Sequence, residues 1–415
     1  MQKQFTGRHL IIGTSLGAFA LLSAGCGSAQ PEAIGVLTQA LVGDALPNLT
    51  PTQLQAFIDG EDAFEEVEGL SDGLGPVFNE KSCGHCHSVG ATGGSGTQFE
   101  RRAGSLTGGT FNSLTSQGGQ LFDLFSVTNL TGAEQRDIPN CTLAKNGEPI
   151  PANANVVANR RTTALFGLGF VDATPDTTFS ALAASEPAAI RGHTNLVSNL
   201  DTGTTTVGKF GWKSQVPTLH QFSGDAYLNE MGITNPQFPN EQPPLGNPAT
   251  IAACDLVPGL EDDGTDVQAF TDFMQGLAPV APLAENASAQ AGDALFTTIG
   301  CDGCHVRTLT AGISPIADIS GHQYHPFSDF LVHDMGSLGD NIGDNGTAGL
   351  REMRTAPLWG LRLVDDKHQL LHDGRATSLS DAILLHDGQA LAARNAFSAL
   401  NTTQRNNLLD FLRTL

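Results

Sequence analysis

Basic residues are scarce in this 415-residue chain, which has 21 Lys and Arg against 43 Asp and Glu. A net charge of −22 at pH 7 repels a phosphate backbone, so nucleic acid is not an expected partner. Long apolar runs are scarce too, since the run from Leu10 to Leu22 is too short to span a membrane comfortably. Strong alternating strand patterns are lacking as well, and we therefore expect a mainly α protein.

The N-terminal segment has the features of a secretory signal. Lys3 and Arg8 precede the apolar run, and small residues lead to Cys26 in "LLSAGC". This stretch resembles a bacterial lipobox, which predicts removal of the signal peptide 1–25 and a lipid on Cys26 that anchors the protein to a membrane. Ordinary signal cleavage nearby is the alternative. Gly27, where Asp would favour the inner membrane, predicts a periplasm-facing lipoprotein of a Gram-negative outer membrane.

Cysteines are few enough for each of the seven to be given a use. One is Cys26, and four belong to two short segments, "CGHCH" and "CDGCH". Cys141 and Cys254 remain, and in an exported protein a disulfide between them is their natural state. Two buried free thiols are the alternative.

The similarity between the two halves extends beyond these cysteine segments. "GPVFNEKSCGHCH" parallels "DALFTTIGCDGCH", with Phe78 and Phe296 each five residues before the first cysteine. Farther along, "RTTALFGL" parallels "RTAPLWGL", and "DFMQGL" parallels "DFLRTL". Three elements in the same order indicate a tandem duplication.

Each cysteine segment has the spacing of a covalent heme c site. Two cysteines separated by two residues can form thioethers to both heme vinyl groups, and the histidine that follows lies beneath the iron. A shared zinc site is disfavoured because the pairs lie in separate units, and a thiol-disulfide motif because a βαβ setting is lacking. Two covalently bound hemes c are therefore predicted, held by Cys83, Cys86, His87, Cys301, Cys304 and His305.

We accordingly expect two tandem cytochrome c-like domains, the first enlarged by long loop insertions. The predicted segments are a tether at 26–44, domain 1 at 45–277, a linker at 278–284 and domain 2 at 285–415. The inserts "GGSGTQFERRAGSLTGGT" and "NPQFPNEQPPLGNP" are read as surface loops. Helices are expected from Pro51, with Thr50 as cap, and in "TTQRNNLLDFLRTL".

The sixth position of each iron largely decides between electron transfer and chemistry. In the second unit, "LLHDGRATSLSDAILLHDGQA" predicts a turn and then a helix from about Ser378 that carries His386, a candidate iron ligand. Met335 is the alternative ligand. Arg161 and Arg354, at matching points of the two units, are candidates for pairing with heme propionates.

The first unit differs at the matching position. Overlaying "WKSQVPTL" on "HDGRATSL" matches Leu219 with Leu379, and therefore Ala226 with His386. The first iron is then expected to be open, unless His220 or His193 closes it.

The stretches "GLGPVFNEKSCGHCH", "FGWKSQVPTLHQF", "NEMGITNPQFP", "FLVHDMG" and "RTAPLWGL" resemble the di-heme oxidoreductase family, also labelled thiol oxidoreductases, which is related to the bacterial di-heme cytochrome c peroxidases. The resemblance covers nearly the whole mature chain. It implies hydrogen peroxide reduction at the first heme, with electrons received through the second from a small soluble cytochrome or copper protein. The alternatives are a non-enzymatic electron-transfer protein and peroxide-dependent oxidation of a protein substrate.

The resemblance also implies roles for single residues. In the peroxidases a ligand lies fourteen residues after a histidine turn, as His386 does after His372. A peroxidase glutamate with an acid-base role follows the inter-heme tryptophan by about eighteen residues, and Glu230 lies eighteen after Trp212. Trp359 is the rival electron relay. The threonine and proline that help hold calcium in the peroxidases are missing from "DKHQLLHDG", which counts against calcium.

Overall fold

The computed structural model describes residues 40–132, 135, 137–367 and 369–415, which belong to one compact unit. Helix accounts for 35% of the structure and strand for 13%, so the protein is mainly α, as predicted. The predicted signal peptide, Cys26 and most of the predicted tether lie outside the described residues. Within those residues, every helix is too short or too polar to cross a membrane.

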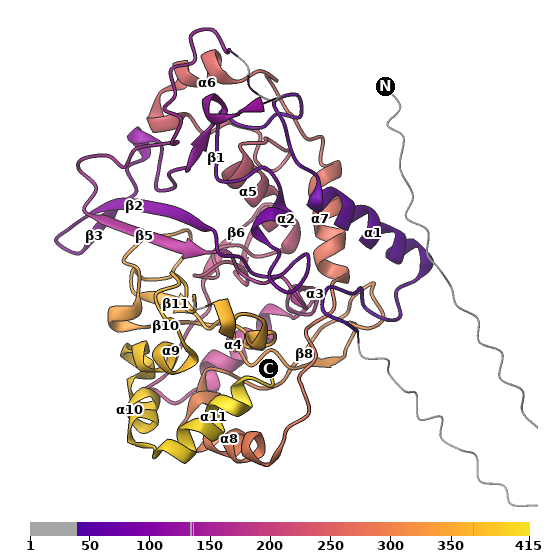
Figure 1. Ribbon diagram of the computed structural model, residues 1–415, viewed down its shortest axis with the longest axis vertical. Helices are drawn as coiled ribbons and strands as arrows, with labels where there is room; N and C mark the ends of the chain where they lie inside the picture. The colour runs from indigo at the N-terminus through magenta and orange to yellow at the C-terminus, as the bar shows by residue number, and fades with distance from the viewer. Residues whose placement is uncertain (1–39, 133–134, 136, 368) are drawn as a thin grey trace, which may run out of the picture. The chain divides into compact units, whose positions relative to one another are not determined.

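Helices occur in both halves of the described chain (Figure 1). They are α1 (Pro51–Glu65), α2 (Cys83–Cys86), α3 (Leu168–Asp172), α4 (Asp176–Ser185), α5 (Leu219–Met231), α6 (Pro248–Cys254), α7 (Thr265–Gly276), α8 (Ala287–Thr298), α9 (Leu379–Leu385), α10 (Leu391–Ala399) and α11 (Thr402–Leu412). The predicted start of α1 is confirmed: Thr50 accepts a hydrogen bond from the Gln53 backbone, the Gln53 side chain accepts one from Thr50, and Pro51 is the first helical residue.

The strands are short and pair antiparallel. They are β1 (Val77–Phe78), β2 (Phe99–Thr107), β3 (Thr110–Asn112), β4 (Phe125–Ser126), β5 (Val156–Arg161), β6 (Leu196–Asn199), β7 (Thr204–Val207), β8 (Leu309–Thr310), β9 (Gln323–Tyr324), β10 (Val332–Asp334) and β11 (Glu352–Arg354). Their pairings are β1–β4, β3–β2–β5, β6–β7, β8–β9 and β10–β11.

The first predicted insert is not entirely loop, because β2 runs through it. β2 pairs with β5 from Phe99 opposite Arg161 to Gly104 opposite Val156, and folds back on β3 through Gly108 and Gly109. Both glycines have positive φ (60° and 85°), the conformation that a two-residue hairpin turn demands. The Gly108-Gly109 turn was the local signal for the β2–β3 hairpin, whereas the pairing with β5 has none, because β5 lies about fifty residues away.

The disulfide between Cys141 and Cys254 is confirmed. The two Cα atoms are 4.8 Å apart, and 113 residues separate the cysteines in the sequence. The bridge joins the segment after β4 to the last residue of α6, so it links two parts of the first half that are far apart in the sequence.

A matching pair of packed helices lies next to each cysteine segment. α1 packs on α7 in the first half, and α8 packs on α11 in the second (Figure 1). Each pair crosses at a glycine, because a Cβ on Gly60 would lie 2.3 Å from the Ala269 carbonyl oxygen and one on Gly292 would lie 2.0 Å from that of Asn407. Closely crossing helices of this kind therefore recur in the two halves.

The aromatic residue that matches Phe296 is Phe64 and not Phe78. Phe64 follows Gly60 by four residues, as Phe296 follows Gly292, and the rings of Phe64 and Phe296 lie 5.0 Å from Phe273 and 5.4 Å from Phe411. Phe78 lies in β1. More residues lie between α1 and Cys83 than between α8 and Cys301. Counting back from the cysteines therefore reaches Phe78 and not the helical residue Phe64.

The buried side chains form two apolar clusters. The larger one combines residues of the first half with residues such as Leu309, Tyr324 and Trp359 of the second, while the smaller one surrounds α8 and α11. Ala278 and Val280, in the predicted linker, are buried in the larger cluster. The two halves therefore share a core, which includes residues of the predicted linker.

We expect Gly292→Ala to destabilise the protein by about 1–3 kcal/mol, because the new methyl group overpacks the crossing of α8 with α11. Helix propensity alone predicts the opposite sign, a gain of about 1 kcal/mol. Urea unfolding decides between them. Ala291→Gly, at an exposed position of the same helix, is the control and should cost about 1 kcal/mol. A stabilised Gly292→Ala variant would show that the helices do not cross as closely as described.

Candidate functional site

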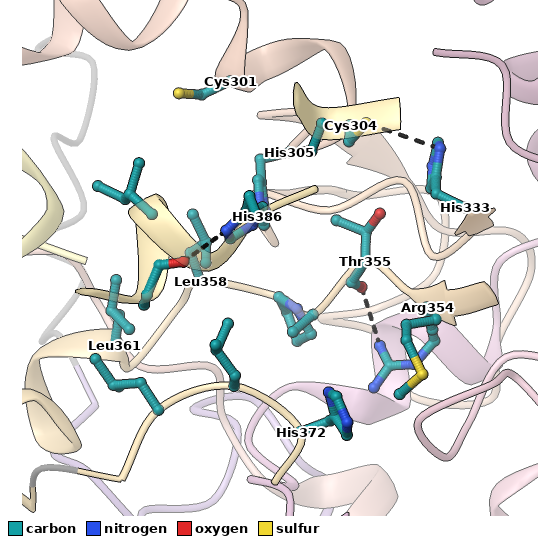
Figure 2. A pocket seen from close by; sticks show the side chains of 18 of the residues that line it. Cys301, Cys304, His305, His333, Arg354, Thr355, Leu358, Leu361, His372 and His386 are labelled. Carbon is teal, nitrogen blue, oxygen red and sulfur yellow. Dashed lines mark hydrogen bonds between the residues drawn. The ribbon is translucent and has the colours of Figure 1, made fainter. Parts of the chain in front are cut away.

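A cavity of about 490 Å³ opens beside the second cysteine segment (Figure 2). Its wall includes Cys301, Cys304 and His305, and residues of the first half complete it, among them Arg161 and Trp212. The volume lies in the range of sites that enclose a small molecule or cofactor. Most of the exposed lining is apolar, as a porphyrin face requires.

His305 and His386 lie close together in this cavity (Figure 2). The Nδ1 atom of His305 is hydrogen-bonded to the Phe327 carbonyl oxygen (2.9 Å), and that of His386 to the Ala382 carbonyl oxygen (2.8 Å). Each ring is thereby oriented with Nε2 left for a metal. Burial lowers the pKa of His305 to about 4 and also lowers the pKa of His386, so both rings are neutral and able to bind iron.

The sequence predicted that His386 belongs to a helix. In the structure it is the residue directly after α9, which ends at Leu385. Met335, the alternative ligand, lines the same cavity from the turn before Gly336–Leu338. His386 lies near enough to His305 to lower its pKa. The structure thus brings both candidates to the cavity and places His386 beside the proximal histidine.

Several buried nitrogen atoms around the cavity form no hydrogen bond to a carboxylate of the described residues. Burial lowers the pKa of Arg354 to about 10, and its Nε donates only to the backbone oxygen of Gly211 (2.7 Å). Arg161 is likewise held by Ser95 and by backbone oxygens, and burial lowers its pKa. Trp359 Nε1 and His372 Nε2 find no hydrogen-bond partner among the described residues. Buried groups of this kind are costly without an anion, and the carboxylates of a heme fit them.

His333, which sequence reasoning did not single out, lies against Cys304. Its Nδ1 is 3.9 Å from the Cys304 sulfur, and its Nε2 is 3.1 Å from an oxygen of Asp329 (Figure 2). The ligand atoms of these three residues lie within 4.8 Å of one another, a spacing that a metal ion could also use. The position of Cys304 directly before His305 favours thioether formation over that use.

The first cysteine segment has a similar arrangement around its histidine. His87 Nδ1 is hydrogen-bonded to the Gly94 carbonyl oxygen (3.1 Å), and the Phe64 ring lies 5.8 Å from the imidazole. Phe296 lies 6.3 Å from His305 in the same way. Burial lowers the pKa of His87 to about 4, so this imidazole is neutral as well.

Glu230 lies near this first segment. Its side chain is half-buried at the end of α5 and accepts a hydrogen bond from Asn79 Nδ2 (2.9 Å), while the Asn79 amide oxygen accepts one from the Leu124 backbone (3.1 Å). Burial, and then the charge of Glu100, raise the pKa of Glu230 to about 7. Burial, and then the charge of the Glu230 carboxylate, raise the pKa of the Cys86 thiol to about 12. A carboxyl group that changes protonation near neutral pH thus lies beside the first segment.

The overlay that matched Ala226 with His386 agrees with the helix boundaries. α5 begins at Leu219 after the cap Thr218, and α9 begins at Leu379 after the cap Ser378. Because both helices start at the matched leucines, Ala226 takes the place in α5 that His386 has after α9. A methyl group at this place cannot bind iron.

The two alternative ligands for the first iron are engaged elsewhere. His193 uses both ring nitrogens, Nε2 with Glu352 (2.9 Å) and Nδ1 with the Thr194 carbonyl oxygen (3.0 Å). His220 Nδ1 is paired with Asp201 (2.7 Å) at the surface. The structure therefore ties both histidines to other partners.

Trp212 and His372 face each other where the halves meet. Their rings lie 6.1 Å apart at 67°, and Trp212 Nε1 donates to the Arg161 carbonyl oxygen (2.7 Å). The Arg161 backbone N–H donates to the His372 carbonyl oxygen (2.7 Å), and the Arg354 N–H donates to that of Trp212 (2.8 Å). In the repeat overlay Arg161 matches Arg354, and Trp212 matches His372. Each half therefore makes the equivalent backbone hydrogen bond to the other half. His372 had no predicted role, although its match with Trp212 was the available signal.

Trp359, the rival relay, also lines the cavity. Its ring lies 6.0 Å from Tyr324, in the larger apolar cluster that the two halves share. Trp212 and Trp359 thus both reach the cavity, and both lie close to residues of the opposite half. Among the described residues Glu230 is not part of the cavity wall, so the structure does not bring Glu230 and Trp212 together there.

Two histidine-bearing cysteine segments, each with a neutral imidazole, and a largely apolar cavity lined by two buried arginines are the features of a heme-binding oxidoreductase. The family model described as "Di-haem oxidoreductase, putative peroxidase" matches residues 150–415, and the chain belongs to this family.

Two solved structures show a weak likeness to this chain. Hydrazine synthase of Kuenenia stuttgartiensis, pressurised with xenon, has 14% identity and a TM-score of 0.41, over 96% of this chain and 100% of that one. A MauG-like protein associated with microbial copper homeostasis has 15% identity and a TM-score of 0.29, over 69% of this chain and 95% of that one. At these scores neither likeness bears on function. No curated protein matches the sequence.

Glu230 provides a test of the electrostatics of the first site. Its pKa in the folded state, about 7, lies above its ordinary value of 4.5, so the folded protein loses stability as the pH rises from 4.5 to 7. Compared with Glu230→Gln, the wild type should lose about 3 kcal/mol over this interval. Chemical denaturation at several pH values measures the difference. Glu285→Gln, at an exposed position, is the control, and equal pH profiles for wild type and Glu230→Gln would refute the burial of this carboxyl group.

Proposed function

We propose that the protein reduces hydrogen peroxide at a heme held by the first cysteine segment, with electrons that enter through a heme held by the second. The two hemes would be covalently attached in tandem cytochrome c-like units. Asymmetry at the sixth position carries this proposal: His386 lies beside His305, whereas Ala226 takes the matching place in the first unit. Bound heme would supply the iron that accepts peroxide and exchanges electrons.

In the second unit Cys301, Cys304, His305 and His386 would hold the heme. His305 and His386 present Nε2 to the cavity, since their Nδ1 atoms are bonded to backbone oxygens. Arg354, Trp359 and His372 offer donors to the heme carboxylates. A site closed by two histidines stores and passes electrons, and we assign this role to the second unit.

In the first unit Glu230 is the proposed acid-base group. Reduction of hydrogen peroxide consumes two electrons and two protons and yields two waters. Glu230 takes the proton from one peroxide oxygen and delivers it to the other, which helps the O–O bond to break. A pKa of about 7 suits both steps, because near neutral pH the group gives up and takes up a proton with equal ease. Asn79 holds the carboxylate in position.

Trp212 is the proposed electron relay between the two sites. It lines the cavity of the second unit and is fixed by its hydrogen bond to the Arg161 backbone. His372 lies against the other side of the same contact. The proposed electron route between the units therefore passes through the contact between Trp212 and His372.

The partners and location follow from the sequence. The acidic chain favours a basic or neutral electron donor, for which we propose a small soluble cytochrome or copper protein. A lipid on Cys26 would anchor the protein to the outer membrane with its hemes in the periplasm, where such donors diffuse. The sequence favours no calcium and no nucleic acid.

Electron paramagnetic resonance of the oxidised and the half-reduced protein tests the proposal. We expect a high-spin signal from the first heme in at least one of these samples, and cyanide should remove it. Low-spin signals alone in both would favour an electron-transfer protein without enzymatic activity.

Turnover with peroxide and a reduced small cytochrome tests the assigned acid-base group. Glu230→Gln should lower kcat by about 10²–10⁴, the range for loss of a proton-transfer group. Glu80→Gln, a nearby substitution, serves as the control and should keep wild-type turnover. If both variants turn over like the wild type, Glu230 is not the acid-base group. Cyanide binding without turnover would instead favour oxidation of a protein substrate.

The cysteine segments give a separate prediction about attachment. Replacing Cys301 and Cys304 by alanine should halve the covalent heme content, measured by heme staining of the denatured protein and by intact mass, because the thioethers of one heme are lost. The equivalent change at Cys83 and Cys86 should also halve it. The Cys141→Ser, Cys254→Ser double variant is the control and should keep both hemes. Full heme content after either heme-segment change would refute c-type attachment.

A further inference from the structure

Tyr227 lies in α5 with its hydroxyl group on a buried carboxylate. The side chain is 2% exposed, and its hydroxyl donates a hydrogen bond to Glu68 Oε1 (2.9 Å), with an oxygen of Asp266 at 3.4 Å. Glu68 is 6% exposed. Burial raises the pKa of Glu68 to about 7, so near neutral pH it can accept a proton. The pair has no part in the function proposed above.

Aromatic rings connect Tyr227 to the first proximal histidine. The ring of Tyr227 is 5.1 Å from that of Phe270, Phe270 is 6.1 Å from Phe64, and Phe64 is 5.8 Å from His87. These distances join ring centroids, and all three lie within the range of packed aromatic pairs, about 4.5–7 Å. Each ring therefore packs against the next one in the series. Tyr227 is therefore joined to the first heme site by packed, buried groups.

Glu68 also lies next to the first cysteine segment, through a backbone hydrogen bond. Its backbone N–H donates to the Lys81 carbonyl oxygen (2.7 Å), two residues before Cys83. The Glu68 carboxylate also contributes, after burial and Cys86, to the raised pKa of the Cys83 thiol. The tyrosine and its proton acceptor thus both belong to the surroundings of the first cysteine segment.

We propose that Tyr227 is a redox-active residue that supplies an electron to the first heme site while its phenolic proton moves to Glu68. This inference rests on the proposed function, since hydrogen peroxide is the oxidant. Peroxide takes two electrons and two protons to give two waters. In half-reduced protein one electron would come from the second heme site, Tyr227 supplies the other, and solvent supplies the two protons. A neutral tyrosyl radical remains on Tyr227, and a donor electron with the proton from Glu68 restores the phenol.

Tyr324 provides a natural comparison, because the chain has just two tyrosines. Its hydroxyl is hydrogen-bonded to the neutral hydroxyl of Thr174 (2.8 Å). A hydroxyl group is a far weaker base than a carboxylate, so Tyr324 has no comparable acceptor for its proton. Both tyrosines are buried and both contact aromatic rings, so the carboxylate is what distinguishes them.

The test is rapid-freeze electron paramagnetic resonance of the half-reduced holoprotein, mixed with hydrogen peroxide in the absence of a donor. The wild type should give an organic radical signal that narrows when the protein contains ring-deuterated tyrosine. Tyr227→Phe should reduce this signal at least tenfold, and Tyr324→Phe should leave it unchanged. Glu68→Gln, which removes the proton acceptor, should also reduce it at least tenfold. Thermal unfolding and the optical spectrum of the hemes verify that each variant is folded and loaded.

The outcomes separate this inference from the proposed function. If peroxide does not change the heme optical spectrum of the wild type, both fail. If the heme spectrum changes but no radical forms, or if the radical survives in Tyr227→Phe or does not respond to deuterated tyrosine, Tyr227 is not the electron source and the peroxidase proposal stands. An undiminished radical in Glu68→Gln would overturn the transfer of the proton to Glu68.

Discussion

Two backbone hydrogen bonds join the halves of the protein at Trp212 and His372, and the candidate site depends on them. Arg161 donates its N–H to the His372 carbonyl oxygen, and Arg354 donates its N–H to that of Trp212. A backbone bond fixes the register of both segments, so the two rings can meet only in the arrangement observed. The cavity beside His305 is completed by first-half residues because this exchange places Arg161 and Trp212 on its wall.

A buried charge network reinforces this contact from the neighbouring residues. Arg160, next to Arg161, is paired with Asp340 and Asp344, and Lys213, next to Trp212, reaches Asp340 (3.2 Å) and the carbonyl oxygens of Gly349 and Leu350. Burying such charges costs desolvation free energy, so the network adds little net stability. Its main effect is to hold these side chains in one arrangement. The network spans the two halves, so it determines how they are oriented where an electron would pass.

The sequence revealed those parts of the site that are short in sequence or repeated. The cysteine segments, the caps of α1 and the overlay of Leu219 on Leu379 are local patterns, and the structure places their residues accordingly. β2 and the true counterpart of Phe296 were missed because each depends on a partner that an insertion had displaced. The Tyr227–Glu68 pair was invisible for the same reason: 159 residues separate its members, and neither residue type signals a site by itself.

One helix explains why the two copies of the repeat can differ in chemistry. α9 stops at Leu385, and the chain turns there to present His386 to the cavity. α5 starts at the matching leucine but continues to Met231, with Gly232 in the left-handed conformation as its end. The place of the histidine is then an alanine inside the helix, and one turn later α5 carries Glu230. The helix that ends just before His386 in the second copy thus continues in the first copy, where it carries Ala226 at the matching position and Glu230 one turn later.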